Sequence, residues 1–467
     1  MTSRFLELRP DNLDSDGTIS FKKGFPVLSF TIQSQNAVLD PRTIRVNGEA
    51  LFYKGFGVVG GNTVGDPVAP NDGADAITMD NRLGVFALMD QLVIRHQRSQ
   101  QIVEHIRHYN RYMTTYLGLS SSRQDLMGHL NESCLIQPNS ESMFRNVVAT
   151  HGGTPATGAR PNAFSAHLPS GFLMGGHSVN LMESSFGGFR IEIHLSPDSN
   201  CMFSRSGVVD AANSEAHYEL KNLSLSCEVM DIPEDRMSEF AAQRDGAMSF
   251  STISSLYTTF NTSNAQIQYD VGLKNLQSAF LTFCPSENIN TLTANGLATT
   301  YPSQKSATAP LVHNTRVQWL KGGSKYPLDY DIVTNKASAL NGDVVLAGGN
   351  ASFTTSDSQL ALQFAEAVIP EYMVSRSSLS TINLNRNYNG SNGAASTQYK
   401  QVRDGGALFG LGIRYSQFNS GQDFSKEQWG VSLSNSLATD KPTSVFIYYK
   451  AKTTVVFDGS GGIQVLQ

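Results

Sequence analysis

The chain has 467 residues, of which 40% are hydrophobic and only 16% are charged, and its formal net charge is −5 at pH 7. This balance excludes a strongly basic nucleic-acid-binding chain, and the length exceeds that of one ordinary domain. The 40 glycines and the many Ser, Thr and Asn residues favour strands joined by turns and long loops over a helical protein.

The first elements predicted in chain order are an arm and a group of strands. Residues 1–24 are expected to form an arm that becomes ordered on contact with a neighbour. They lack the apolar core of a signal peptide, and no apolar run in the chain reaches the ~18 residues that span a membrane. Strand patterns follow at Val27–Ile32, at Thr43–Val46 and in ALFYKGFGVVG, before a Gly/Pro/Asn-rich loop from Gly60 to Ala76.

A long helix is then predicted from about Asn81 to Leu117. Apolar residues recur there mostly three and four positions apart, Asp80 or Asn81 can cap the helix, and a break near Ser99 can divide it. The recurring residues are Val85, Leu88, Met89, Leu92, Ile102, Ile106, Tyr109, Met113 and Tyr116.

Two strands close the first half. FRIEIHL, residues 189–195, alternates apolar and polar side chains, which indicates a strand with one buried face. YELKNLSLSCEV, ending at Val229, is the second strand. The charged segment 231–249, which contains Pro233, is interpreted as a linker, so that a first domain occupies residues 25–230.

The second half, residues 250–457, repeats this plan. AQIQYDV and SAFLTF are predicted strands, and TRVQWLKGGSKYPLDYDI is a predicted hairpin that turns at Gly322-Gly323. SDSQLALQFAEAVI is a predicted helix, in which Ser356 and Gln359 are spaced as a capping box and which Pro370 ends. LFGLGIRY, WGVSLS and SVFIYYKAKTTVVF are the closing strands, and residues 458–467 are a second arm.

This order of elements resembles the double jelly-roll major capsid proteins of tailless double-stranded DNA viruses, the lineage of adenovirus hexon, virophages and polinton-like viruses. The resemblance covers about residues 25–460. It is carried by SFTIQSQNAVLDPRTIRVNGEALFY, FRIEIHLSPDSNCMF, YELKNLSLSCEVMDIPED, LKGGSKYPLDYDI and VFIYYKAKTTVVFDGSGG. It implies an all-β fold of two tandem eight-stranded jelly rolls, which are β-sandwich domains, each with a prominent inserted helix.

The resemblance also implies a structural function without enzymatic activity or cofactor. Homotrimers would form pseudo-hexagonal capsomers that tile an icosahedral shell around a DNA genome. The implied partners are neighbouring capsomers, penton proteins and minor or cement proteins, with weak genome or inner-membrane contact on the inner face. The protein would be made in the host cytoplasm, assembled there, in the nucleus or in a viral factory, and found in the virion.

Four aromatic residues in loop segments are candidates for the trimer interface, because large interfaces use apolar and aromatic side chains. They are Phe164, Phe172, Phe186 and Tyr388. The alternative function is that of a penton or spike β-sandwich that binds a receptor or carbohydrate. A third hypothesis, a glycoside hydrolase or lyase, is disfavoured because sugar clefts use aromatic platforms and the chain has only Trp319 and Trp429.

We assign no catalytic, cofactor-binding or metal-ligating residue, because no P-loop, Gly-x-Ser-x-Gly or His-Glu-x-x-His motif is present. His96, His105 and His108 lie in a segment rich in arginine, where the positive charge disfavours a metal ion and leaves a solvated, inter-subunit or phosphate-contacting face. The arginines of this segment are Arg95, Arg98, Arg107 and Arg111. The acidic residues Asp329, Asp331, Glu192 and Asp198 are interpreted as surface carboxylates.

The four cysteines complete the candidates for site chemistry. They are Cys134, Cys201, Cys227 and Cys284. None forms a Cys-x-x-Cys pair or lies near a histidine at metal-ligand spacing. We interpret them as small buried hydrophobic residues in a reducing compartment.

Overall fold

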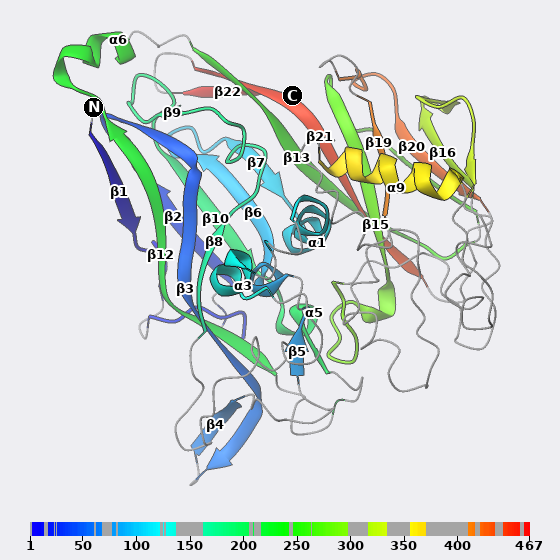
Figure 1. Ribbon diagram of the computed structural model, residues 1–467, viewed down its shortest axis with the longest axis horizontal. Coiled ribbons are helices and arrows are strands. Elements are labelled where there is room, and N and C mark those ends of the chain that lie inside the picture. Colours follow the sequence, from blue (N-terminus) through cyan, green and yellow to red (C-terminus); the bar gives the residue numbers. More distant parts are fainter. Residues whose placement is uncertain are drawn as a thin grey trace.

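The chain folds into two β-sandwiches that lie side by side (Figure 1). The computed structural model describes residues 2–467 with gaps at 14–16, 23, 25, 60–61, 68–76, 81–82, 122–124, 126–127, 137–161, 205–208, 210–215, 242–245, 263, 298–315, 334–354, 370–409, 416–420, 435–441 and 458–461. Four main antiparallel sheets make up the two sandwiches. The predicted all-β class with two tandem jelly rolls is confirmed.

The first sandwich is built from two sheets and a small ribbon. The strands of one sheet are β1 (Ser3–Leu8), β3 (Ala37–Val59), β4 (Asn62–Pro67), β8 (Asn162–His167), β9 (Val179–Asn180) and β12 (His217–Asp231). They pair in the order β1-β12-β3-β4, and β8 and β9 also pair with β3. The facing sheet, ordered β2-β10-β6-β7, contains β2 (Val27–Ile32), β6 (Met89–His96), β7 (Ile102–Ile106) and β10 (Phe189–Leu195). The ribbon joins β5 (Ile77–Met79) to β11 (Met202–Ser204).

The second sandwich has two sheets of five strands. The strands of one sheet are β13 (Ala247–Phe260), β15 (Leu276–Pro285), β19 (Gly410–Arg414), β21 (Thr443–Phe457) and β22 (Ile463–Leu466). They pair in the order β13-β21-β15-β19, and β22 pairs with β21. The other sheet, ordered β14-β20-β16-β17 with β18 on β16, contains β14 (Ala265–Tyr269), β16 (Arg316–Lys321), β17 (Ser324–Lys325), β18 (Ile332–Val333) and β20 (Trp429–Ser434).

Short helices complete the described part of the chain. They are α1 (Tyr109–Ser120), α3 (His129–Cys134), α5 (Asp198–Cys201), α6 (Met237–Ala241), α9 (Thr355–Val368) and the 3₁₀ turns η1 (Gly84–Leu88), η3 (Glu234–Arg236) and η5 (Ser286–Asn288). Helix α1 lies between the two sandwiches, and α9 crosses the second sandwich (Figure 1). Among the described residues, no helix has the length and hydropathy needed to cross a membrane.

The two halves have the same strand order. In each half the opening strand, β1 or β13, pairs with the closing strand, β12 or β21. The closing strand also pairs with β3 or β15, which in turn pairs with β8 and β9 or with β19. In the other sheets, the order β2-β10-β6 corresponds to β14-β20-β16. The pair of closing strands that recurs in the sequence therefore completes a jelly roll each time.

Both terminal segments that were expected to be arms contain strands paired within the chain. In residues 1–24, β1 pairs with β12 from Ser3↔Met230 to Leu8↔Leu225. Leu6 and Leu8 pack against the first core, so alternating apolar residues hold this segment on the sheet. In residues 458–467, β22 pairs with the end of β21. The expected linker contains η3, α6 and the first residues of β13.

The predicted helix from Asn81 to Leu117 is wrong over most of its length. The structure has η1, β6 and β7 in this segment, and only α1 is helical. Strand β6 pairs with both β10 and β7, and its Leu92, Val93 and Ile94 are all buried. Apolar residues on both faces of a central strand, next to a 3₁₀ turn, produce the three- and four-residue spacing that was interpreted as a helix.

Other predicted elements are confirmed with changed ends. FRIEIHL is β10, and its apolar residues are buried while its polar residues are partly exposed. The predicted turn at Gly322 and Gly323 has φ values of +56° and +84°, which favour glycine. Within the described residues, Ser324–Lys325 and Ile332–Val333 pair with β16, and the N–H of Tyr326 donates to the carbonyl of Trp319 at 2.9 Å. The paired part of the return side is therefore short. The predicted helix at residues 356–369 is α9, and its capping-box side chains and Pro370 lie outside what the structure describes.

The central part of the sheet of β13, β21, β15 and β19 is buried on both faces. Leu281 and Ile447 lie opposite one another and face the core of the second sandwich, which also holds Trp319 and Trp429. The next pair along the strands, Phe280 and Tyr448, faces α1 and belongs to the core of the first half. This middle sheet therefore explains the continuous apolar run in SVFIYYKA.

Glycine allows α9 to lie directly on this middle sheet. A Cβ atom at Gly412 would lie 2.6 Å from Ala367 Cβ and 2.9 Å from Phe364 Cα. Leu411 and Ile413, on the other face of β19, fill the second core. The alternation in GLGI thus matches a helix on one face of the strand and a packed core on the other.

We expect Gly412→Ala to destabilise the protein by about 1–3 kcal/mol, because the added methyl group overpacks the contact between α9 and β19. Urea unfolding followed by circular dichroism measures the loss. Gln266→Ala on the exposed side of β14 is the control and should change the free energy of unfolding by less than about 0.5 kcal/mol. A Gly412→Ala protein as stable as the control would contradict this description of the contact.

Candidate functional site

The junction between the sandwiches centres on the carboxylate of Glu104, which lies on β7 and is 2% exposed. Its Oε1 accepts hydrogen bonds from the backbone N–H groups of Gly171 at 3.0 Å and Ile253 at 2.8 Å. Its Oε2 accepts one from the N–H of Phe172 at 2.9 Å. Gly171 and Phe172 belong to the first half and Ile253 to β13, so one side chain joins both halves.

Burial raises the pKa of Glu104, and the backbone N–H donors act in the opposite direction by stabilising the charged form. A buried carboxylate without such donors would be strongly unfavourable, so the three hydrogen bonds and the position of the side chain depend on one another. Glu104 is not among the candidate residues that the sequence indicated. The available signal was a lone acidic residue between the apolar residues of IVEHI.

Further polar contacts cross the junction beside Glu104. The N–H of Arg107 donates to Ser255 Oγ at 2.9 Å, and Ser255 Oγ donates to the carbonyl of Arg107 at 3.0 Å. The hydroxyl of Tyr448 donates to the carbonyl of His108 at 2.9 Å. These bonds fix the segment between β7 and α1 against β13 and β21, so the two sandwiches share a polar as well as an apolar contact.

Arg111 is buried in the same junction, which corrects its assignment to a solvated or phosphate-contacting face. Its side chain is 1% exposed, and its guanidinium lies 3.9 Å from the centre of the Phe446 ring. It also donates to the carbonyl of Gly296. A cation over an aromatic face is stabilised by the ring electrons, so Arg111 connects α1 to β21.

The three histidines of the sequence analysis lie on separate elements. His105 on β7 contacts Gln91 Oε1 at 3.0 Å, and burial together with Arg107 lowers its pKa to about 4. His108 precedes α1, and its Nδ1 lies 3.6 Å from Asp90 Oδ1. Among the described residues, no group of three or more His, Cys, Asp or Glu side chains is placed to hold a metal ion.

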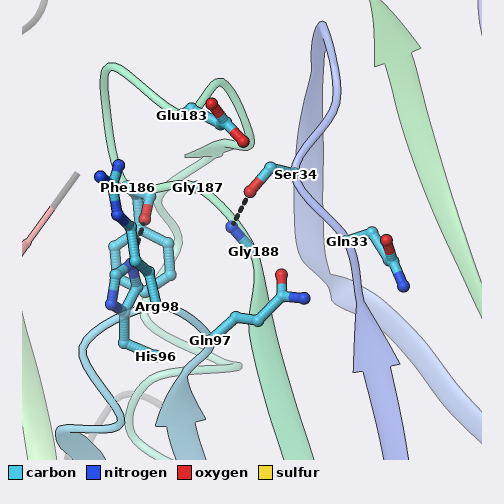
Figure 2. Close-up of a pocket in the computed structure, with 9 residues that line it drawn as sticks. All are labelled: Gln33, Ser34, His96, Gln97, Arg98, Glu183, Phe186, Gly187 and Gly188. Atoms are coloured by element: carbon cyan, nitrogen blue, oxygen red, sulfur yellow. Dashed lines mark hydrogen bonds between the residues drawn. The ribbon is translucent and has the colours of Figure 1, made fainter.

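The third histidine, His96, lies at a pocket at the end of the first sandwich (Figure 2). Its Nε2 donates to the carbonyl of Phe186 at 2.7 Å, and its Nδ1 contacts Ser99 Oγ at 2.8 Å. Both ring nitrogens are therefore occupied within the chain. The pocket is also lined by Gln33, Ser34, Gln97, Arg98, Glu183, Gly187 and Gly188.

The acidic candidates have different environments. Asp331 forms an ion pair with Lys325, with 2.6 Å between Asp331 Oδ1 and Lys325 Nζ, and Asp329 is exposed. The interpretation as surface carboxylates holds for both residues. Glu192 forms an ion pair with Arg95 at 3.1 Å on the outer face of β10 and β6. Asp198 is half-buried, unlike the surface carboxylate that the sequence indicated, and accepts a hydrogen bond from the N–H of Tyr218 at 3.1 Å. Burial raises the pKa of Asp198 to about 6.

The aromatic residues proposed for a trimer interface are core residues instead. Phe164 is 5% exposed, and Phe172 and Phe186 are fully buried. Phe172 packs against Phe186 and Phe250, with ring centres 5.6 Å and 5.1 Å apart, so it joins the loop after β8 to β13. Aromatic residues in loop-like sequence were assigned to the surface because the sequence does not reveal that these loops cover a core. Tyr388 lies outside the described residues.

The cysteines are buried, as predicted. Cys134, Cys201, Cys227 and Cys284 are free thiols with at most 2% exposure. Burial raises the pKa of each thiol, which keeps the sulfur protonated and unreactive.

We expect Glu104→Gln to loosen the junction, because an amide NH₂ would replace one of the two oxygens that face backbone N–H groups. The expected loss of unfolding free energy is about 1–3 kcal/mol, measured by urea denaturation. Hydrogen exchange should speed up at residues 171–172 and 253 in particular. Glu7→Gln, on the exposed face of β1, is the matched control. Unchanged exchange at these amides would show that Glu104 does not hold the halves together.

The raised pKa of Asp198 predicts how the free energy of unfolding depends on pH. Because its folded pKa is raised from 3.8 to about 6, the native state binds the proton more tightly, and the stabilisation is lost as pH rises from about 4 through 6. Asp198→Asn keeps the acceptor for Tyr218 but removes the titration. The variant should therefore gain about 2 kcal/mol relative to the wild type between pH 4 and pH 7 in unfolding experiments. A difference independent of pH would contradict this account.

The fold is similar to that of several solved structures. No protein-family model and no curated protein sequence matches the chain. The chain is similar to the quasi-atomic model of the PBCV-1 virus capsid, with a TM-score of 0.53, 10% identity and coverage of 100% of this chain and 97% of that chain. It is similar to the Faustovirus major capsid protein, with a TM-score of 0.52, 8% identity and coverage of 98% and 90%.

A further similarity is to the mavirus major capsid protein, with a TM-score of 0.50, 9% identity and coverage of 99% of this chain and 90% of that chain. Each match spans both sandwiches, so it concerns their arrangement as well as the fold of either half. The chain therefore has the double jelly-roll fold of these viral major capsid proteins.

Proposed function

We propose that this protein is the major capsid protein of an icosahedral double-stranded DNA virus and that three copies form a pseudo-hexagonal capsomer. The observation that carries the proposal is the repeated strand order of two sandwiches within one chain. Two similar units per chain give six per trimer, so a threefold object can occupy a sixfold position in a lattice. The full-chain likeness to viral capsid proteins supports the same assignment.

The junction at Glu104 and Arg111 supports this function. A shell protein transmits load between its two halves, and a hinge at their contact would allow the capsomer to deform. The buried carboxylate, the cation over Phe446 and the helix α1 instead fix the halves as one unit. The function is structural, and the chemistry of the described residues is used to hold the fold.

We also propose a domain division that follows the strand order. The expected first jelly roll at 25–230 extends back to residue 3, because β1 occupies the same position in its sheet as β13 does in the second half. The second jelly roll, expected at 250–457, likewise begins with β13 at residue 247. Residues 232–246 then form the linker, and β22 extends the second jelly roll at its end.

The partners implied by this function are neighbouring capsomers, penton proteins and minor or cement proteins, with weak contact to a genome or an inner membrane. The site of action is the virion, after synthesis in the host cytoplasm and assembly there, in the nucleus or in a viral factory. The alternative of a carbohydrate-binding spike lacks support among the described residues. Trp319 and Trp429, the strongest sugar-stacking residues, are 1% and 0% exposed.

Purified recombinant protein tests the capsomer directly. Size-exclusion chromatography with light scattering should give about three times the chain mass of 50.7 kDa, and negative-stain microscopy should give particles with a hexagonal outline. A glycan array serves as the comparison, since a lattice protein needs no saccharide affinity. A monomer at all concentrations, or specific glycan binding by a monomer, would overturn the proposal in favour of the spike.

A further inference from the structure

A cleft of about 500 Å³ opens between the two sandwiches. Its floor is the outer end of the middle sheet, formed by β13, β21, β15 and β19. Its walls are α1, the last turn of α9 and residues 169–175 of the first half. The volume lies within the range of roughly 300–1,000 Å³ that is typical of binding pockets.

The floor of the cleft is cationic although the chain is acidic overall. Lys450 lies opposite Ile253 on one side and Ser278 on the other, and Ser278 lies opposite Arg414. Lys452 follows on the same face of β21, one row further out. Residues opposite or two apart on a sheet share a face, so three cations line one end of this sheet.

Lys450 is the central group of this floor. It is half-buried, and burial together with Arg414 lowers its pKa. No hydrogen bond or ion pair joins its ammonium to any residue in the described part of the chain. Lys325, by contrast, forms an ion pair with Asp331 at 2.6 Å. Among the described residues that line the cleft, Glu366 is the one carboxylate.

The walls of the cleft are largely apolar. The side chains that line them include Tyr116, Met174, Val368 and Ile369. Met174 is 46% exposed, which is a large fraction for a methionine beside a core. A ligand that matches this lining combines negative charge toward the floor with apolar groups toward the walls.

We propose that this cleft binds an acidic peptide segment of a partner protein. A carboxylate of the segment pairs with Lys450 and Lys452, and neighbouring apolar side chains of the segment contact the walls. A nucleic acid fits less well, because its phosphates pair with cations on open surfaces and its sugars would face apolar walls. Binding of an acidic peptide follows from the lining of the cleft alone. The identity of the partner as another protein of the virion rests on the proposed function.

The test uses the purified full-length chain and a fluorescein-labelled hexapeptide of alternating Glu and Leu. The same peptide with Gln in place of Glu is the uncharged probe, and a labelled single-stranded DNA of 12 nucleotides is the phosphate probe. Lys450→Met and Lys452→Met remove the two cations while keeping a long side chain. Lys426→Met removes the same charge from an exposed turn outside the cleft and is the matched control.

We expect fluorescence anisotropy to show binding of the Glu peptide that weakens by about tenfold or more in Lys450→Met and Lys452→Met and is unchanged in Lys426→Met. The Gln peptide should bind at least about tenfold more weakly than the Glu peptide. The proposal is overturned if the Glu peptide does not bind, if all three variants bind it alike, or if the DNA binds more tightly and with the same dependence on Lys450. Light scattering on the same samples reports trimer formation separately, so a trimer that ignores the peptide refutes this inference alone.

Discussion

The arrangement of the two sandwiches depends on the buried carboxylate of Glu104. Its two oxygens accept three backbone N–H groups, two from the first half and one from β13. Without Glu104 these three backbone N–H groups would lose this acceptor, and a buried N–H group without an acceptor lowers the stability of the fold. The contact therefore selects one relative position of the halves, which apolar packing alone would leave free to slide.

The middle sheet belongs to both hydrophobic cores, so it also holds the two halves in one relative position. One face of β15 and β21 completes the core around Trp319 and Trp429, and the other face packs on α1 and α9. Along Ala279–Cys284 and Val445–Tyr449 neither face is left to solvent, so the second sandwich cannot rotate without separating α1 from Tyr448 and Arg111 from Phe446. A rigid double unit suits the proposed role in a lattice, in which the shape of the unit would set its contacts with neighbours.

The sequence predicted the fold class and the closing strands well, because alternation in segments such as FRIEIHL reports burial directly. It failed at residues 84–106, where a strand buried on both faces has no alternation to report. It also failed at Phe172 and Arg111, whose burial depends on segments far away in the chain. Glu104 was missed for the same reason: its partners are 67 to 149 residues distant, and a single carboxylate in a strand carries no local signature.

The pairing of opening and closing strands sets the order in which the chain can fold during synthesis. β12 reaches β1 and β3 once residue 231 has been made, so the first sandwich can close while the rest of the chain is still on the ribosome. The second sandwich waits for β21, which ends at Phe457. Until then β13 and β15 have no central strand between them, so their apolar faces are exposed during elongation. Nascent chains released early would therefore carry one finished sandwich and one incomplete, aggregation-prone half.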